Sequence, residues 1–320
     1  MRPLHSTATA FTRADIQFDA GGVTLRGWLY RPIGPVSAPG APTPGAPTPG
    51  ATIVMAGGFG TSKEMYTDRY AEKFAAAGFI VLLYDQRGFG ASDGEPRHEI
   101  DPWLQVEDLR HALTCAHGLV QVDPARVGVW GSSYSGGHAL VVAATDHRVS
   151  CVVAQVPTIS GSRTARRRIG GAADQALLAR FADDRQRRAN GADPARLPLA
   201  GDAASGALYQ SPDALDWYAG ACRLAGHAMP VITLRSVELA RAYDPGDYIA
   251  RISPTPLLMQ VAQHDQITPT DLALRAYRDA LEPKALQLID GAGHFDVYIR
   301  DVEAVSDAAL RWFERHLRKP

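Results

Sequence analysis

The sequence predicts an α/β fold: a mostly parallel central sheet with helices on both faces and a helical insertion between two strands. Short apolar runs, such as residues 51–56 and 79–84, alternate with helical segments over the first half of the chain. This alternation is typical of parallel sheets. It stops over residues 158–250, which are rich in Ala and Arg, and then resumes. We therefore expect a core of residues 1–157 and 251–320 and an inserted lid of residues 158–250.

The first patterned segment is an N-terminal hairpin. Apolar and polar residues alternate over residues 14–31 around Gly21-Gly22, which is typical of two antiparallel strands joined by a tight turn. Residues 41–50 then repeat the unit APTPG twice. Because a segment with so much Pro and Gly cannot pack into a core, we expect an extended surface linker there.

Strands and helices alternate after this linker. The apolar run at residues 51–56 predicts a strand that is buried on both faces. Thr61 and Glu64 have the spacing of a helix capping box, so we expect a helix that starts there and ends at Gly78. A second apolar run predicts the next strand at residues 79–84.

The following elements continue the same alternation. Asp101 precedes a proline, and this pair is a favoured start for a helix, here residues 102–118. An apolar run predicts a strand at residues 126–131. A helix over residues 134–144 and a strand over residues 149–157 complete the part of the core that precedes the insertion.

The last part of the chain returns to this pattern. Residues 256–265 form an apolar run that predicts a strand, and residues 268–271 (TPTD) are suited to cap the helix after it. Residues 284–291 predict the last strand, and residues 296–318 the closing helix.

Composition excludes several classes of function. The chain has 320 residues, 46% of them hydrophobic, and a net charge of −1, so nothing favours nucleic acid or an anionic membrane as a partner. It lacks both an apolar run long enough to span a bilayer and the pattern of a signal peptide. Three widely spaced cysteines suggest reduced thiols, so we expect a cytoplasmic protein. No metal-binding spacing occurs, and we expect neither a metal nor another cofactor.

The motif GSSYSGG at residues 131–137 offers three candidate nucleophiles. A sharp strand-to-helix turn fixes and exposes a serine only if the residues two before and two after it are small. Ser132 fails because Trp130 lies two residues before it, whereas Ser133 and Ser135 both satisfy the condition. Ser133 has the offset from the apolar run that such turns require, and Ser135 would lie inside the helix. We therefore expect Ser133 to be the nucleophile and keep Ser135 as the alternative.

A serine nucleophile needs a base and an acid that orients it. His294 lies in a glycine-rich loop after the last predicted strand, from which its side chain can reach the carboxyl edge of the sheet. Asp265 ends another buried strand at the same edge. Asp271 and Asp290 are weaker candidates, because one lies at a helix start and the other in a turn. The chain order Ser133, Asp265, His294 is a known order for such triads.

Negative charge on a carbonyl oxygen needs hydrogen-bond donors that already point at it. The N–H of Tyr134 begins the helix after the nucleophile turn, and we expect it to be one donor. The glycine-rich loop at residues 57–60 (GGFG) should supply the second through the N–H of Phe59. This loop lacks the spacing of phosphate-binding and dinucleotide-binding motifs.

With these residues the chain resembles the α/β-hydrolase superfamily. It is most similar to serine hydrolases near the dienelactone hydrolases and the polyketide-tailoring thiohydrolases or acyltransferases. The resemblance covers residues 51–157 and 255–318. It rests on five stretches: GGFGTSKEMY, LLYDQRGFGASDGEPRHEIDP, DPARVGVWGSSYSGGHAL, HDQITP and GAGHFD.

The resemblance implies an α/β-hydrolase fold with a catalytic triad and an oxyanion hole. The positions that match are Ser133, Asp265 and His294 for the triad, with the amides of Phe59 and Tyr134 for the oxyanion hole. Two residues depart from the family pattern: Ser135 replaces the usual Gly, and Gly57 stands where many relatives have His. The stretch YDQRGFGASDG resembles the family's structural turn, in which we expect Asp85 and Arg87 to form an ion pair.

These observations predict a serine hydrolase that cleaves a carboxylic ester or thioester through an acyl-enzyme. One alternative is acyl transfer to an alcohol or amine acceptor, and another is a non-catalytic binding protein on the same fold. We expect a small acyl compound as the partner, and the sequence leaves open whether the chain forms a homodimer. The arginines of residues 163–171 (RTARRRIGG) could contact a carboxylate or a carrier phosphate, or form a solvated helix face.

Overall fold

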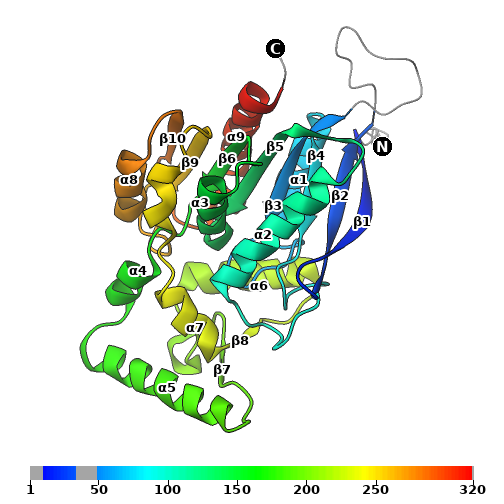
Figure 1. Cartoon of the computed structure of the whole chain (residues 1–320). Coiled ribbons are helices and arrows are strands. Elements are labelled where there is room, and N and C mark those ends of the chain that lie inside the picture. The colour runs from blue at the N-terminus through cyan, green and yellow to red at the C-terminus, as the bar shows by residue number, and fades with distance from the viewer. Residues whose placement is uncertain (1–9, 34–48, 319–320) are drawn as a thin grey trace, which may run out of the picture.

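The computed structural model describes residues 10–33 and 49–318 and shows an eight-stranded sheet between two layers of helices (Figure 1). The strand order is β1-β2-β4-β3-β5-β6-β9-β10. β1 pairs antiparallel with β2, and β2 with β4, while all other neighbours are parallel. The strands are β1 Phe11–Asp19, β2 Thr24–Pro32, β3 Gly50–Ala56, β4 Ile80–Tyr84, β5 Val122–Ser132, β6 Cys151–Gln155, β9 Leu257–Ala262 and β10 Lys284–Ile289.

The predicted fold class and N-terminal hairpin are confirmed. Gly21 and Gly22 both have positive φ angles, 66° and 86°, which let the chain reverse tightly between β1 and β2. Gly27 in β2 has no room for a side chain, because a Cβ there would lie 2.3 Å from the carbonyl oxygen of Leu83 in β4. The predicted linker, residues 41–50, lies outside the described residues except for its last two.

The helices of the core lie in two layers. α1 and α9 cover one face of the sheet, and α2, α3 and α8 cover the other (Figure 1). The predicted start of α2 is confirmed, because the carboxylate of Asp101 accepts hydrogen bonds from the N–H groups of Trp103 and Leu104, at 3.0 and 3.3 Å. The helices are α1 Thr67–Ala76, α2 Pro102–His117, α3 Tyr134–Thr145, α8 Thr270–Asp279 and α9 Val302–Leu317.

The predicted capping box at Thr61 and Glu64 is wrong. Helix α1 begins only at Thr67, and no side chain caps it. The hydroxyl of Thr61 donates to the carbonyl of Gly58, and Glu64 pairs with Lys63 at 2.7 Å. Both side chains therefore stabilise the loop before the helix.

The predicted ion pair between Asp85 and Arg87 is also wrong. Asp85 is buried, and its carboxylate accepts from both the backbone N–H and the ammonium of Lys63, each at 2.7 Å. Arg87 instead donates to Asp108 of α2, with an Nε to Oδ2 distance of 2.7 Å. Each of the two charged side chains thus takes its partner from another segment, and the two pairs fasten the turn after β4 to the loop after β3 and to α2.

The chain between β6 and β9 forms an inserted segment beyond the carboxyl edge of the parallel strands, at the bottom of Figure 1. It contains four α-helices and a small antiparallel pair of strands, followed by a 3-10 turn at Pro245–Arg251 that leads back toward the core. Its elements are α4 Gly161–Arg168, α5 Gly171–Ala189, β7 Arg196–Pro198, α6 Pro212–Ala225, β8 Val231–Thr233 and α7 Leu234–Arg241. In the described ranges, no helix combines the length and apolarity needed to cross a membrane.

Candidate active site

Ser133 occupies a sharp turn between β5 and α3. Its φ and ψ are 59° and −114°, a conformation that non-glycine residues rarely adopt and that strained functional turns use. The turn leaves no room at Gly131, where a Cβ would lie 2.1 Å from the carbonyl oxygen of Ser135. Neighbouring backbone holds Ser133 in place: its N–H donates to Gln155 at 2.9 Å, and its carbonyl accepts from Thr158 at 2.9 Å.

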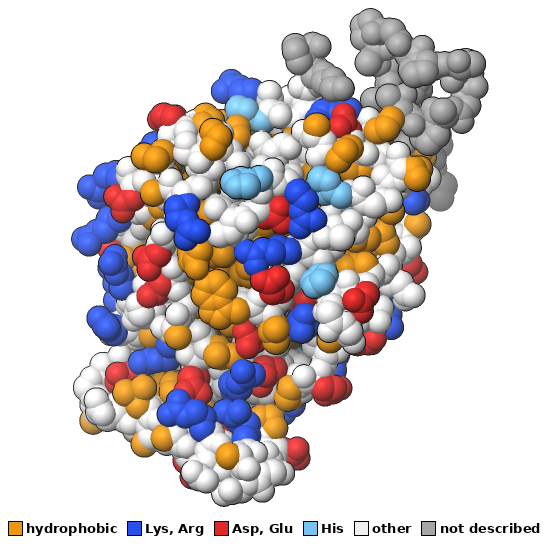
Figure 2. Space-filling view, in the orientation of Figure 1, with side chains coloured by type: hydrophobic (Ala, Val, Ile, Leu, Met, Phe, Trp, Pro, Cys, Tyr) orange, Lys and Arg blue, Asp and Glu red, His pale blue; other side chains and the backbone are white. Residues whose placement is uncertain are grey.

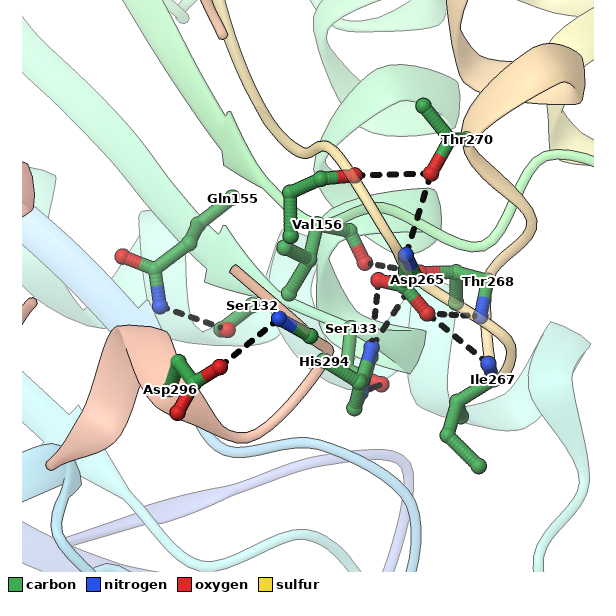
Figure 3. A network of polar contacts seen from close by, with 12 residues as sticks. Ser132, Ser133, Gln155, Val156, Asp265, Ile267, Thr268, Thr270, His294 and Asp296 are labelled. Carbon is green, nitrogen blue, oxygen red and sulfur yellow. Dashed lines mark hydrogen bonds and ion pairs between the residues drawn. The ribbon is translucent and has the colours of Figure 1, made fainter. Parts of the chain in front are cut away.

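The structure brings Ser133, His294 and Asp265 together at the carboxyl edge of the sheet (Figure 3). The hydroxyl of Ser133 lies 3.0 Å from Nε2 of His294, and Nδ1 of the same ring lies 2.8 Å from Oδ2 of Asp265. The three residues are 8, 3 and 3% exposed, so the chain of hydrogen bonds is shielded from bulk water. This is the geometry that lets an imidazole take a proton from a serine and share the resulting charge with a carboxylate.

Asp265 is held by donors from the loop between β9 and α8. Its Oδ1 accepts from the N–H groups of Ile267 and Thr268, both at 2.8 Å, and its Oδ2 lies 2.8 Å from the hydroxyl of Thr268 (Figure 3). The two weaker candidates for the acid lie elsewhere. Asp271 pairs with Arg167 at 2.6 Å, and Asp290 is exposed in a turn.

Ser132 and Ser135 have buried structural partners. The hydroxyl of Ser135 donates to the carbonyl of Gly57 and accepts from Nε2 of Gln86 at 3.1 Å. Ser132 shares a hydrogen bond with Tyr298 and accepts another from Gln155. Neither serine contacts a histidine by these bonds, so Ser133 has the geometry of a nucleophile and Ser135 does not.

The two predicted oxyanion donors lie beside Ser133. Tyr134 is the first residue of α3, and in the described part of the chain neither its N–H nor that of Phe59 donates a hydrogen bond. The loop with Phe59 packs closely on the nucleophile, because a Cβ at Gly58 would lie 3.3 Å from that of Ser133. Both N–H groups are therefore available to a ligand, as an oxyanion hole requires.

A pocket with about 700 Å³ of empty space, which includes space open to solvent, leads from Ser133 into the inserted segment. Phe59, Tyr134, Ile267 and Thr268 contribute the core side of its lining. The inserted segment contributes mostly apolar residues and two arginines, namely Thr164, Ala165, Arg168, Ile169, Leu177, Leu208, Tyr209, Val237, Ala240 and Arg241. Such a pocket suits a ligand with an apolar chain.

The supporting contacts of two residues were not predicted from the sequence. Thr268 bonds Asp265 and lies 3.3 Å from Nδ1 of His294 through the same hydroxyl. Tyr218, in α6 of the inserted segment, donates to the carbonyl of Phe59 at 2.8 Å and so supports the loop that carries a predicted oxyanion donor. A Thr three residues after the acid was visible as a local signal, whereas nothing in the sequence connects position 218 to position 59.

Comparison with known proteins points to one family. Residues 51–301 match the family model described as the alpha/beta hydrolase fold. The quorum-quenching protein AidA of Acinetobacter baumannii is 32% identical over 285 residues, which cover 89% of this chain and 88% of that protein. The polyketide transferase grgF of Penicillium is 31% identical, covering 97% and 99% of the two chains.

Two further matches agree with this family. A thiohydrolase of Eupenicillium brefeldianum is 30% identical, covering 89% of this chain and 88% of the relative. The crystal structure of the alpha/beta hydrolase GrgF from Penicillium superposes with a TM-score of 0.79 and 30% identity, covering 96% of this chain and 99% of the other.

Proposed function

Since this chain belongs to the alpha/beta-hydrolase family, we propose that it cleaves a carboxylic ester or thioester through an acyl-enzyme on Ser133. The observation that carries this proposal is the hydrogen-bonded series from Ser133 through His294 to Asp265 at the end of an apolar pocket. The family match and the relative named as a thiohydrolase favour an enzyme over a non-catalytic binding protein on the same fold.

In the first half of the proposed reaction, His294 accepts the proton of Ser133 while the serine oxygen attacks the carbonyl carbon of the substrate. The imidazolium that forms is stabilised by Asp265, which lies 2.8 Å away and is held in place by three donors. The N–H groups of Phe59 and Tyr134 would receive the negative oxygen, and each such donor is typically worth about 3 kcal/mol in the transition state.

Collapse of this intermediate breaks the bond to the leaving alcohol or thiol, which receives its proton from His294. In the second half, a water molecule takes the place of the leaving group, and His294 accepts its proton as the water attacks the acyl carbon. The acid then departs and Ser133 recovers its proton. We further propose that residues 158–250 act as the lid that selects the acyl chain, because they supply most of the apolar lining of the pocket.

Acyl transfer to an alcohol or amine is a second candidate function. It is favoured by the relative named as a polyketide transferase, which is 31% identical and covers nearly the whole chain. The same acyl-enzyme serves both reactions, so the outcome depends on whether water or an acceptor reaches the acyl carbon. Product analysis of thioester cleavage with and without added alcohols distinguishes them, because a transferase forms ester at the expense of free acid.

A fluorophosphonate probe tests the proposed nucleophile. We expect it to modify Ser133 alone, and we expect Ser133→Ala to abolish both labelling and turnover of thioesters. Ser135→Ala is the matched control, because Ser135 lies two residues away and its hydrogen bonds in the described part of the chain go to Gly57 and Gln86, outside the triad. It should keep a large part of the activity. Peptide mapping that places the label on Ser135, or turnover by Ser133→Ala, would contradict the proposal.

A further inference from the structure

Three arginines of the inserted segment lie at or near the pocket, and their partners differ. Arg167 forms an ion pair with Asp271, and Arg241 forms one with Asp174, each at 2.6 Å. Arg168 has no carboxylate within ion-pair distance in the described residues. It donates one hydrogen bond, at 2.8 Å, to the neutral carbonyl of Ile267 and lies over the ring of Tyr209.

The surroundings of Arg168 leave its charge available. The pocket lining contains no Asp or Glu, so nothing there competes for the guanidinium. A guanidinium has five N–H donors in a planar fork, and within the described residues only one of those of Arg168 has an acceptor. Arg168 is an exposed residue that also lines the pocket, so an anion that enters from solvent can reach its free N–H groups.

The surrounding charge points the same way. Helices α4 and α5, residues 161–189, contain eight Arg and three Asp, although the whole chain has a net charge of −1. The inserted segment contains no lysine, so the blue side chains that gather over it at the bottom of Figure 2, with some red ones among them, are arginines. This surplus attracts anions toward the side of the pocket on which Arg168 lies.

We infer that Arg168 binds an anionic group of the substrate, a carboxylate or a phosphate, while the acyl carbon lies at Ser133. This inference rests on the proposed acyl transfer at Ser133. The anion has two possible sources: a carboxylate at the far end of the acyl chain, or a phosphate on the leaving thiol. Both are planar or forked oxygen groups that a guanidinium binds with two parallel hydrogen bonds.

Four thioesters distinguish the two sources. The first is a neutral reference, the hexanoyl thioester of N-acetylcysteamine. The second carries an adipoyl group and so ends in a carboxylate, and the third is its methyl ester. The fourth carries the hexanoyl group on 4′-phosphopantetheine. We expect the wild-type protein to favour one anionic thioester over its neutral counterpart in kcat/KM.

The variant Arg168→Met should lower kcat/KM for that anionic thioester about tenfold to hundredfold, the range expected for a hydrogen bond to a charged group. The neutral thioesters should change less than about threefold, and Arg168→Lys should recover part of the loss. Arg166→Met is the control, because Arg166 is exposed on the same helix and does not line the pocket.

An equal loss for charged and neutral thioesters would overturn the inference, because it would show that Arg168 only supports Ile267. The same loss in Arg166→Met, or no preference for an anion in the wild-type protein, would also overturn it. In those cases cleavage of the neutral thioesters leaves the proposed function standing. If the wild-type protein cleaves none of the four, the proposed function fails and the inference fails with it.

Discussion

His138 lies in helix α3, five residues after Ser133, and its side chain is buried. We expect this imidazole to make the free energy of unfolding fall as the solution is acidified. Its Nε2 lies 3.0 Å from the amide oxygen of Gln105, an acceptor, so Nε2 carries the proton of the neutral ring. Its Nδ1 then accepts from the hydroxyl of Tyr243 at 2.9 Å. Burial lowers the pKa of His138 from 6.5 to about 3. The folded protein therefore holds a neutral imidazole that the unfolded chain would protonate.

The sign of the effect follows from this pKa. Below pH 6.5 the unfolded state binds a proton that the folded state rejects, so stability is lost as the pH falls from 6.5 toward 3. Well below pH 6.5, where the unfolded imidazole is fully protonated, each further pH unit costs about 1.4 kcal/mol. At pH 6.5 only half of the unfolded chains are protonated at this ring, so the contribution of His138 to the free energy of unfolding should fall by about 2 kcal/mol between pH 6.5 and pH 4.5.

The variant His138→Gln removes the titrating group and keeps an amide donor that can reach Gln105. Urea unfolding at a series of pH values should show that the variant, although less stable at pH 7, loses about 2 kcal/mol less unfolding free energy than the wild type between pH 6.5 and 4.5. Tyr243→Phe is the control, because it removes the hydrogen bond but leaves the buried imidazole, so its slope should match the wild type. Parallel profiles for the wild type and His138→Gln would refute the reasoning.

Three further substitutions test the site and its support. Asp265→Asn should leave the fold intact and lower kcat by about 10³- to 10⁴-fold, because an amide neither sets the tautomer of His294 nor stabilises its charge; steady-state kinetics with a thioester measures this, and near-normal kcat would exclude the role. Tyr218→Phe removes the donor to the carbonyl of Phe59 and should cost about 1 kcal/mol in stability, measured by urea unfolding, with a several-fold lower kcat; an unchanged kcat would show that this bond does not support the oxyanion loop. Gly131→Ala would place a Cβ 2.1 Å from a carbonyl oxygen of α3, so we expect a loss of more than about 3 kcal/mol, read from the thermal midpoint, and a fully stable variant would contradict the geometry of the turn.

Much of the fold could be predicted from the sequence because parallel strands leave local signals. Each buried strand is a short apolar run, and the residue after it lies at the carboxyl edge. Together with the small residues around Ser133 and the glycine-rich loop of His294, that rule predicts that Ser133, Asp265 and His294 lie near one another, and the structure brings them within hydrogen-bonding distance. Their catalytic roles stay a proposal that the fluorophosphonate experiment tests.

The wrong partner of Asp85 and the missed contact of Tyr218 have a common physical cause, which is contact between segments far apart in the sequence. Glu64 has the local spacing of a capping box, but in the structure its carboxylate pairs with Lys63, which also pairs with Asp85. Sequence spacing favours Arg87, a near neighbour, as the partner of Asp85. In the structure this buried carboxylate instead binds Lys63, the cation that the fold brings to it. Tyr218 could not be linked to Phe59 in advance, because the bond crosses from the inserted segment to the core.

The position of the inserted segment between two neighbouring strands affects how its sequence can change without disturbing the sheet. Strands β6 and β9 are parallel neighbours, with Gln155 opposite Gln260, so the chain departs from one strand and returns on the adjacent one. A replacement of everything between them, longer or shorter, would leave this register unchanged. Evolution or a designed chimera could therefore exchange the half of the pocket that we propose selects the acyl chain, provided the replacement keeps a hydroxyl where Tyr218 reaches the loop of Phe59.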